Sequence, residues 1–227
     1  AGMIVVRRGT MELLSDDEKS EIINKMEPMD ILLEKAPFRL TDYFIPGYWC
    51  HVGVWAGNEK QLKSVGVWDS LPRLYELAVK KYAYSGPDFQ TSIRSGHKII
   101  ESLRPGVQIN TLQNFLNIDD LGVIRFTGQT DKDKKTYLLN AFSQIGKNYD
   151  FSFNVESTDE IVCSELVYAS FEDLVWDTKK QLGRHTISPD QVARKLITDK
   201  RFEPVLLYLN GKSVNSELKT VFNSLLD

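Results

Sequence analysis

Two cysteines and three histidines in this chain could supply a nucleophile and a base, and Cys163 is the first candidate. It lies at the predicted start of a helix that runs to about Leu174. Unpaired backbone N–H groups and the helix dipole favour a thiolate at such a position. The same N–H groups can receive an oxyanion as it forms. Free cysteine is also among the most buried residue types, so position alone favours a structural thiol.

The base would have to be a histidine, and His51 lies in the clearest setting. It begins a predicted strand over residues 51–56, in which His51, Gly53 and Trp55 share one face. Taken alone, a histidine in a strand is more often a hydrogen-bonded structural residue. His97 follows a glycine in a predicted loop, and His185 precedes a turn where it would do no more than stabilise a loop.

The elements that must position these residues follow from hydrophobic periodicity and capping signals. Helices at both ends enclose a middle set of short strands, which is typical of an α+β protein. Helices are predicted at about 15–27, 71–82, 130–145, 163–174, 190–197 and 214–225, and strands at about 30–33, 51–56, 98–102, 107–110, 123–126 and 205–209.

Composition excludes several classes of protein. The 227 residues carry a formal net charge of −3, which argues against a nucleic-acid partner because phosphate contacts need a basic surplus. No apolar run reaches the roughly 20 residues that span a bilayer, so no stable membrane insertion is expected. Two cysteines are too few for a disulfide framework or an all-cysteine zinc site. The first three residues, Ala1-Gly2-Met3, do not form a signal peptide.

Five short segments occur in a distinctive order along the chain. They are Asp30–Leu33, Cys50–Trp55, Ile99–Ser102 with Pro105–Val107, Tyr149–Phe151 and Val162–Val167. Their order is similar to the circularly permuted branch of the NlpC-type papain-like cysteine hydrolases, in particular the YiiX/YaeF-like group, with lecithin:retinol acyltransferase as a more distant relative. In this branch the histidine strand precedes the cysteine helix, and the resemblance covers roughly residues 28–195.

The resemblance implies a catalytic triad without a metal or organic cofactor. Cys163 would attack a carbonyl, and His51 would take its proton. Glu101 matches the position of the third residue, which orients the imidazole; its alternative is a solvent-facing carboxylate on an edge strand. His97 is the reserve candidate for the third role.

Three further residues are expected in the substrate site. Tyr149 matches an aromatic segment that precedes the cysteine helix, and its hydroxyl could donate to substrate or oxyanion, although an aromatic residue after a helix usually just packs. Ser164 follows the nucleophile, and Trp55 shares a strand face with His51. Cys50 is read as structural.

The expected architecture is one papain-like domain over residues 1–227. A small antiparallel sheet or barrel would carry the nucleophile helix. Residues 57–97 depart from the family's short link and form an insertion, either a cap over the cleft that narrows the substrate range or a packing appendage.

The leading functional hypothesis is a cysteine peptidase or amidase acting on a small peptide or amide. The resemblance implies a murein peptide as substrate, in a bacterial periplasm or cell envelope. A second hypothesis is a lipid acyltransferase or thioesterase, in which the same thiolate forms an acyl-enzyme. A third is a non-catalytic binding domain with a retired site.

Overall fold

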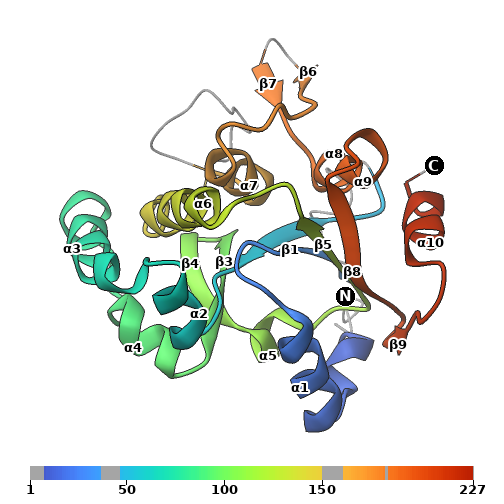
Figure 1. Cartoon of the computed structure of the whole chain (residues 1–227), viewed down its shortest axis with the longest axis horizontal. Coiled ribbons are helices and arrows are strands. Elements are labelled where there is room, and N and C mark those ends of the chain that lie inside the picture. Colours follow the sequence, from blue (N-terminus) through green and yellow to red (C-terminus); the bar gives the residue numbers. More distant parts are fainter. Residues whose placement is uncertain (1–7, 37–46, 150–160, 182–183, 227) are drawn as a thin grey trace, which may run out of the picture.

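The computed structural model describes residues 8–36, 47–149, 161–181 and 184–226, apart from the side chains of residues 179–185. A seven-stranded sheet with the order β4-β3-β2-β1-β5-β8-β9 runs through the molecule, and all of its neighbouring strands are antiparallel (Figure 1). A separate hairpin joins β6 to β7. The strands are β1 Ile31–Lys35, β2 His51–Trp55, β3 His97–Leu103, β4 Gly106–Thr111, β5 Asp120–Phe126, β6 Lys179–Gln181, β7 Arg184–Thr186, β8 Phe202–Leu209 and β9 Lys212–Ser213.

Helices surround this sheet, so the mixed architecture confirms the α+β prediction. Several begin at the polar caps that the sequence indicates, such as Ser15 before α1 and Thr130 before α6. The helices are α1 Asp16–Lys25, α2 Glu59–Ser64, α3 Leu71–Tyr82, α4 Phe89–Arg94, α5 Leu112–Phe115, α6 Asp131–Ser143, α7 Cys163–Ser170, α8 Pro189–Ala193, α9 Lys195–Thr198 and α10 Leu218–Ser224, with short 3-10 helices η1 Thr10–Leu13 and η3 Trp68–Ser70.

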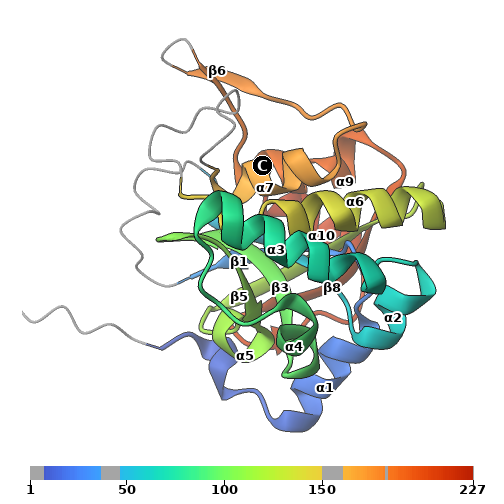
Figure 2. The same cartoon turned by 90° about the vertical axis from the view of Figure 1, so that its left-hand side faces the viewer.

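Both faces of the sheet are covered, which explains why β2 is buried along its whole length. On one face, Val52 and Val54 join a core with residues of α6 and α7, such as Phe142 and Leu166. On the other face, Trp55 joins a smaller core with residues of α1 and α5. Figure 2 shows α6 and α7 on one side of the sheet and α1 and α5 on the other. Because side chains alternate along a strand, His51 shares the face of Trp55.

Helix α7 is shorter than its hydrophobic pattern predicts. The pattern extends to Leu174, but the helix ends at Ser170 because Phe171 leaves the helical conformation (φ −104°, ψ 62°). A turn follows, in which the N–H of Leu174 donates to the C=O of Phe171, and both side chains still enter the core. The apolar spacing therefore indicates which residues are buried, and it continues beyond the last residue of the helix.

The predicted insertion folds as α2, η3, α3 and α4. Helix α3 lies against α6, and α4 lies against β3 (Figure 1). Large side chains from the insertion, Trp68 and Phe89, are buried in the main core, and Phe89 packs against Phe142 of α6. The insertion is thus attached to the sheet and α6 by apolar packing.

Candidate active site

Three elements bring the predicted triad together at one end of the sheet. His51 is the first residue of β2, and Glu101 lies on the neighbouring strand β3, where it faces the same side because Gly53 pairs with Glu101. Cys163 is the first residue of α7, which packs on the opposite face of β2 and β3, so the side chain of Cys163 reaches His51 at the end of the sheet where β2 begins. All three side chains are buried, with exposed fractions of 6% for His51, 3% for Glu101 and 5% for Cys163.

A line of hydrogen bonds fixes the histidine ring. Nε2 of His51 lies 2.8 Å from Oε2 of Glu101, and Nδ2 of Asn110 on β4 donates to Oε1 of Glu101 over 2.8 Å. Because a carboxylate only accepts, the Nε2 proton of His51 points at Glu101. Nδ1 is then the ring nitrogen available to Cys163.

The start of α7 presents the thiol at the positive end of a helix. The helix begins without a polar N-cap side chain, since its N-cap is Val162; instead Oε2 of Glu165 accepts from the N–H of Val162 over 2.9 Å. The first amides of a helix have no carbonyl four residues earlier to bind. Their N–H groups therefore remain beside Cys163 as donors, and the dipole favours negative charge there.

Two buried hydroxyl groups hold this helix start in place. Ser164 donates from Oγ to the C=O of Ile187 over 2.6 Å, and Ser102 on β3 donates from Oγ to the C=O of Ile161 over 2.7 Å. The second bond ties the segment before Cys163 directly to the strand that carries Glu101. The position of Cys163 is thus fixed relative to the sheet.

The surroundings of His51 stabilise its charged form. Burial lowers the pKa of His51, but electrostatic interaction with Cys163 and with Glu34 raises it. Hydrogen bonding with Cys163 and Glu101 raises the pKa further, so that it lies well above the usual histidine value. A raised histidine pKa favours the imidazolium form of His51 beside Cys163.

Glu34 is a second carboxylate beside the histidine, and the sequence patterns did not single it out. It lies on β1 directly across from His51 in the antiparallel register, and only 1% of its surface is exposed. Directly opposed residues face the same side of a sheet. The signal that could have found it is an acidic residue within the buried apolar strand that pairs with the histidine strand.

The other predicted site residues lie in different settings. Trp55 is at the far end of β2 and is 1% exposed within the smaller core, so its ring is a packing group. Ser164 is buried and serves the tether to Ile187. Tyr149 is half-buried, and its N–H donates to the C=O of Pro105. Asp150 and Phe151 of the same predicted segment lie outside the described residues.

His97 and the second cysteine, Cys50, have other hydrogen-bond partners. His97 is the first residue of β3, which ends at Leu103. Its Nδ1 lies 3.1 Å from Oγ of Ser95. The side chain of His185 lies outside the described part of the chain. Cys50 donates from Sγ to the C=O of Glu34 and accepts from the N–H of Ala36, which fits a structural thiol.

An aspartate from a distant element anchors the segment that enters β2. Asp190, in the first turn of α8, accepts from the backbone N–H groups of Tyr48 and Trp49 over 3.0 and 2.7 Å. These two residues come just before Cys50 and His51. Asp190 thereby fixes the approach of the chain to the histidine, and nothing in the local sequence predicts this contact.

The chain belongs to a family of cysteine hydrolases. The sequence model of the permuted papain-like amidase enzymes, described as YaeF/YiiX, C92 family, matches residues 25–223. This match confirms the resemblance and the permuted papain-like fold, and it identifies the protein as a papain-like cysteine amidase or peptidase at the level of the family.

Comparison with solved structures gives one further relative. A structure described as the metalloprotein yiiX from Escherichia coli O157:H7, DUF1105, is 16% identical, with a TM-score of 0.46, and the match covers 78% of this chain and 82% of that one. No curated protein matches the sequence. Within the described residues, no group of three or more His, Cys, Asp or Glu side chains is arranged to hold a metal ion. No helix among them has the length and apolar character needed to cross a membrane.

Proposed function

We propose that this protein hydrolyses amide bonds with Cys163 as nucleophile, His51 as acid and base, and Glu101 as the residue that orients the imidazole. The observation that carries the proposal is the line of side-chain contacts from Asn110 through Glu101 to His51, with Cys163 as the next partner of the ring. A nucleophile needs a base within reach and a third group that holds the base.

In the first half of the reaction, Sγ of Cys163 attacks the carbonyl carbon of the amide, and the electron pair moves to the carbonyl oxygen. The N–H groups at the start of α7 stabilise that oxyanion. The imidazolium of His51 then gives its Nδ1 proton to the leaving nitrogen as the C–N bond breaks. An amine departs, and an acyl-thioester remains on Cys163.

In the second half, water attacks the thioester carbonyl while neutral His51 takes a proton from it. The C–S bond breaks, the carboxylic acid leaves and the thiolate–imidazolium pair is restored. Glu101 holds the ring through both halves, because the bond at Nε2 stays while Nδ1 changes its proton. The two halves together consume one water molecule per amide bond cleaved.

The substrate we propose is a peptide, and murein peptides are the first class to test. The support for a peptide or amide is the family, whose members are described as amidases. The support for murein peptides is the resemblance to the NlpC-type branch. A panel of murein peptides, phospholipids and acyl-thioesters separates amide hydrolysis from acyl chemistry on lipids, because only the first releases an amine.

The chain offers an internal control for the reactivity of Cys163. Cys50 is also a free thiol and is similarly buried, with 8% of its surface exposed against 5% for Cys163. We expect iodoacetamide to alkylate Cys163 at least tenfold faster than Cys50, as followed by peptide mass spectrometry. His51→Ala should reduce the Cys163 rate to that of Cys50. Equal rates in the wild-type protein would contradict an activated thiolate.

Turnover tests the same assignment directly. Cys163→Ala should lower kcat/KM on the panel by about 10³-fold or more, since catalysis loses its nucleophile. Cys50→Ser, the matched control, should remain within a few-fold of wild type. Hydrolysis that persists in Cys163→Ala and disappears in Cys50→Ser would overturn the proposal.

A further inference from the structure

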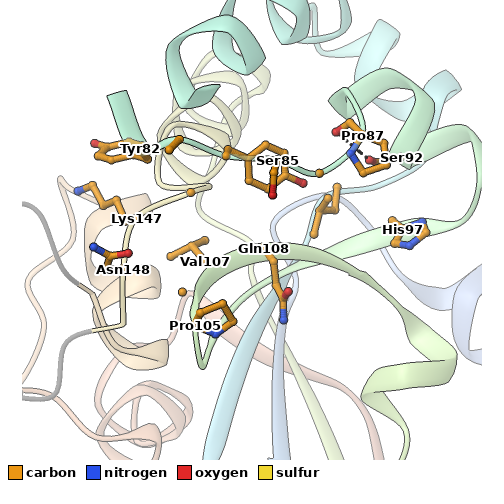
Figure 3. Close-up of a pocket in the computed structure, with 16 residues that line it drawn as sticks. Tyr82, Ser85, Pro87, Ser92, His97, Pro105, Val107, Gln108, Lys147 and Asn148 are labelled. Atoms are coloured by element: carbon orange, nitrogen blue, oxygen red, sulfur yellow. Dashed lines mark hydrogen bonds between the residues drawn. The ribbon is translucent and has the colours of Figure 1, made fainter. Parts of the chain in front are cut away.

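A pocket of about 430 Å³ lies along the β4 edge of the sheet, and none of the three proposed triad residues lines it. Figure 3 shows the link from α3 to α4, with Tyr82 and Ser85, on one side and the β3–β4 turn, with Pro105, on the other. Lys147 lies at one end. The volume falls within the range of about 300–1,000 Å³ that is usual for ligand sites. Residues of the 57–97 insertion therefore form one wall of a ligand-sized pocket.

The sheet edge in this pocket carries an open pair of backbone groups. The N–H of Val107 donates to the C=O of Lys147, and the N–H of Gly146 donates to the C=O of Val107, both over 2.9 Å. Outward-facing backbone groups recur at every second residue of an antiparallel strand, so Ile109 directs its N–H and C=O to the same edge. Ile109 lines the pocket, and no residue in the described ranges bonds to either group.

An open donor and acceptor on one residue of an edge strand match an extended peptide. A strand added to such an edge forms both bonds with a single residue of its own, and its side chains fill the flanking space. The space here is bounded by Val107, where the edge is already paired, and by Thr111, where β4 ends. The ligand segment is therefore short, about two or three residues at roughly 3.3 Å per residue.

The pocket is continuous with the segment that carries the nucleophile. Asn148 lines the pocket, and its C=O accepts from the N–H of Ile161, two residues before Cys163. Gln108 also lines it and pairs across β4 and β3 with Glu101. A peptide held at Ile109 would therefore be separated from Glu101 by β4 alone and would lie near the chain that leads into α7.

We infer that this pocket binds a short extended segment of a peptide substrate, which adds to β4 through the N–H and C=O of Ile109. That the bound peptide is a substrate rests on the proposed function. That the pocket binds a peptide does not depend on it. It also assigns a role to the insertion: the 82–87 segment confines the added strand and so restricts which peptides fit.

The first test measures binding without turnover. Pools of acetylated tripeptide amides are titrated into the ¹⁵N-labelled full chain carrying Cys163→Ala. The expected result is a saturable shift of the Ile109 amide resonance, together with hydrogen exchange of that amide slowed by at least tenfold. If no pool moves Ile109, or if pools move other residues and leave Ile109 unchanged, the inference is overturned.

A pair of variants and a pair of peptides sharpen the result. Ser85→Trp places a large ring in the pocket and should weaken binding of the best peptide at least tenfold. Ser64→Trp, at an exposed position of α2 in the same insertion, should leave binding within twofold. N-methylation of the peptide nitrogen that donates to the C=O of Ile109 should weaken binding similarly. Equal affinities of Ser85→Trp and Ser64→Trp for the best peptide, or of one protein for the methylated and unmethylated peptides, would exclude strand addition in this pocket.

The outcome is distinguishable from failure of the proposed function. Binding at Ile109 with no cleavage of the same peptide by wild-type protein would uphold the pocket and reject the amidase. Cleavage that depends on Cys163 but is unaffected by Ser85→Trp and N-methylation would uphold the amidase and reject the pocket.

Discussion

The two ends of β1 each hold a buried carboxylate, and the two carboxylates have different partners. Asp30, just before the strand, is fully buried and receives Nε and an Nη of Arg125 on its two oxygens over 2.7 and 2.8 Å. Glu34, near the other end, is 1% exposed and lies opposite His51. Arginine is always charged in proteins, whereas the charge of histidine changes near neutral pH.

This difference separates a structural site from a chemical one within five residues of one strand. The Asp30–Arg125 pair has matched geometry, and the guanidinium keeps its charge at any ordinary pH, whereas burial raises the pKa of Asp30. The Glu34–His51 end gathers a second carboxylate, Glu101, and a thiol around one titratable ring. The excess negative charge there favours the imidazolium, which the proposed chemistry uses.

The largest effect is expected at the structural end. Arg125→Met would leave Asp30 buried without its counter-ion, and the free energy of unfolding should fall by about 3 kcal/mol, the low end for a broken buried pair because 22% of the Arg125 side chain is exposed. Urea denaturation measures this. Arg8→Met, which removes the exposed pair with Glu12, should cost under about 1 kcal/mol. Equal losses of unfolding free energy in Arg125→Met and Arg8→Met would show that the pair with Asp30 stabilises the fold no more than the exposed pair with Glu12.

At the chemical end, a charge can be removed with little change in shape. Glu101→Gln should lower kcat about 10–100-fold, or about 1.4–2.7 kcal/mol in activation free energy, because the ring loses its anionic partner. KM should change less than threefold, since Glu101 contacts His51 and not the substrate. Glu76→Gln on the exposed face of α3 is the matched control. A kcat within twofold of wild type would remove Glu101 from the mechanism.

Sequence reasoning predicted the triad because its members lie on elements with clear local signals. His51 begins an alternating strand, Cys163 begins an apolar helix stripe, and the order of the segments matches a family. Antiparallel pairing of β2 with β3 then brings Glu101 to His51. Local patterns identify such elements well because burial on one face imposes their period.

The supporting residues were missed because their contacts depend on strand register and on distant segments. Glu34 meets His51 only through the pairing of β1 with β2, and Asp190 reaches Tyr48 and Trp49 across more than a hundred residues. Neither contact leaves a period or a spacing in the sequence. Trp55 was predicted in the substrate site because it shares a strand face with His51, but it lies in the smaller core at the other end of β2. A shared strand face does not indicate which end of the strand borders the site.

A smaller effect is expected when the segment that leads into His51 loses its anchor, Asp190. Asp190→Ala removes the acceptor for two backbone N–H groups and should lower the free energy of unfolding by about 1–2 kcal/mol. Because the loosened segment leads into His51, kcat should fall as well, by a few-fold. Asp69→Ala, at an exposed position of η3, should change neither quantity. Loss of stability with unchanged kcat would restrict Asp190 to the fold.

The smallest expected effect is a shift along the pH axis. The negative charge of Glu34 raises the pKa of His51, so Glu34→Gln should lower that pKa. The imidazolium would then lose its proton at a lower pH, and the alkaline limb of the kcat/KM profile should move to lower pH, while the rate on the plateau changes little.

The direction in which the alkaline limb moves distinguishes the Glu34 end of β1 most clearly from the Asp30 end. Three charged or titratable groups on separate elements act on His51: Glu34 on β1, Glu101 on β3 and Cys163 on α7. Glu101→Gln should move the alkaline limb the same way as Glu34→Gln but with a fall in kcat, because Glu101 also holds the ring. Arg125→Met should leave the limb in place, since Asp30 and its partner lie at the opposite end of the strand. A limb that stays fixed in Glu34→Gln, or moves to higher pH, would show that Glu34 does not act on the histidine and that only Glu101 and the thiolate set its charge.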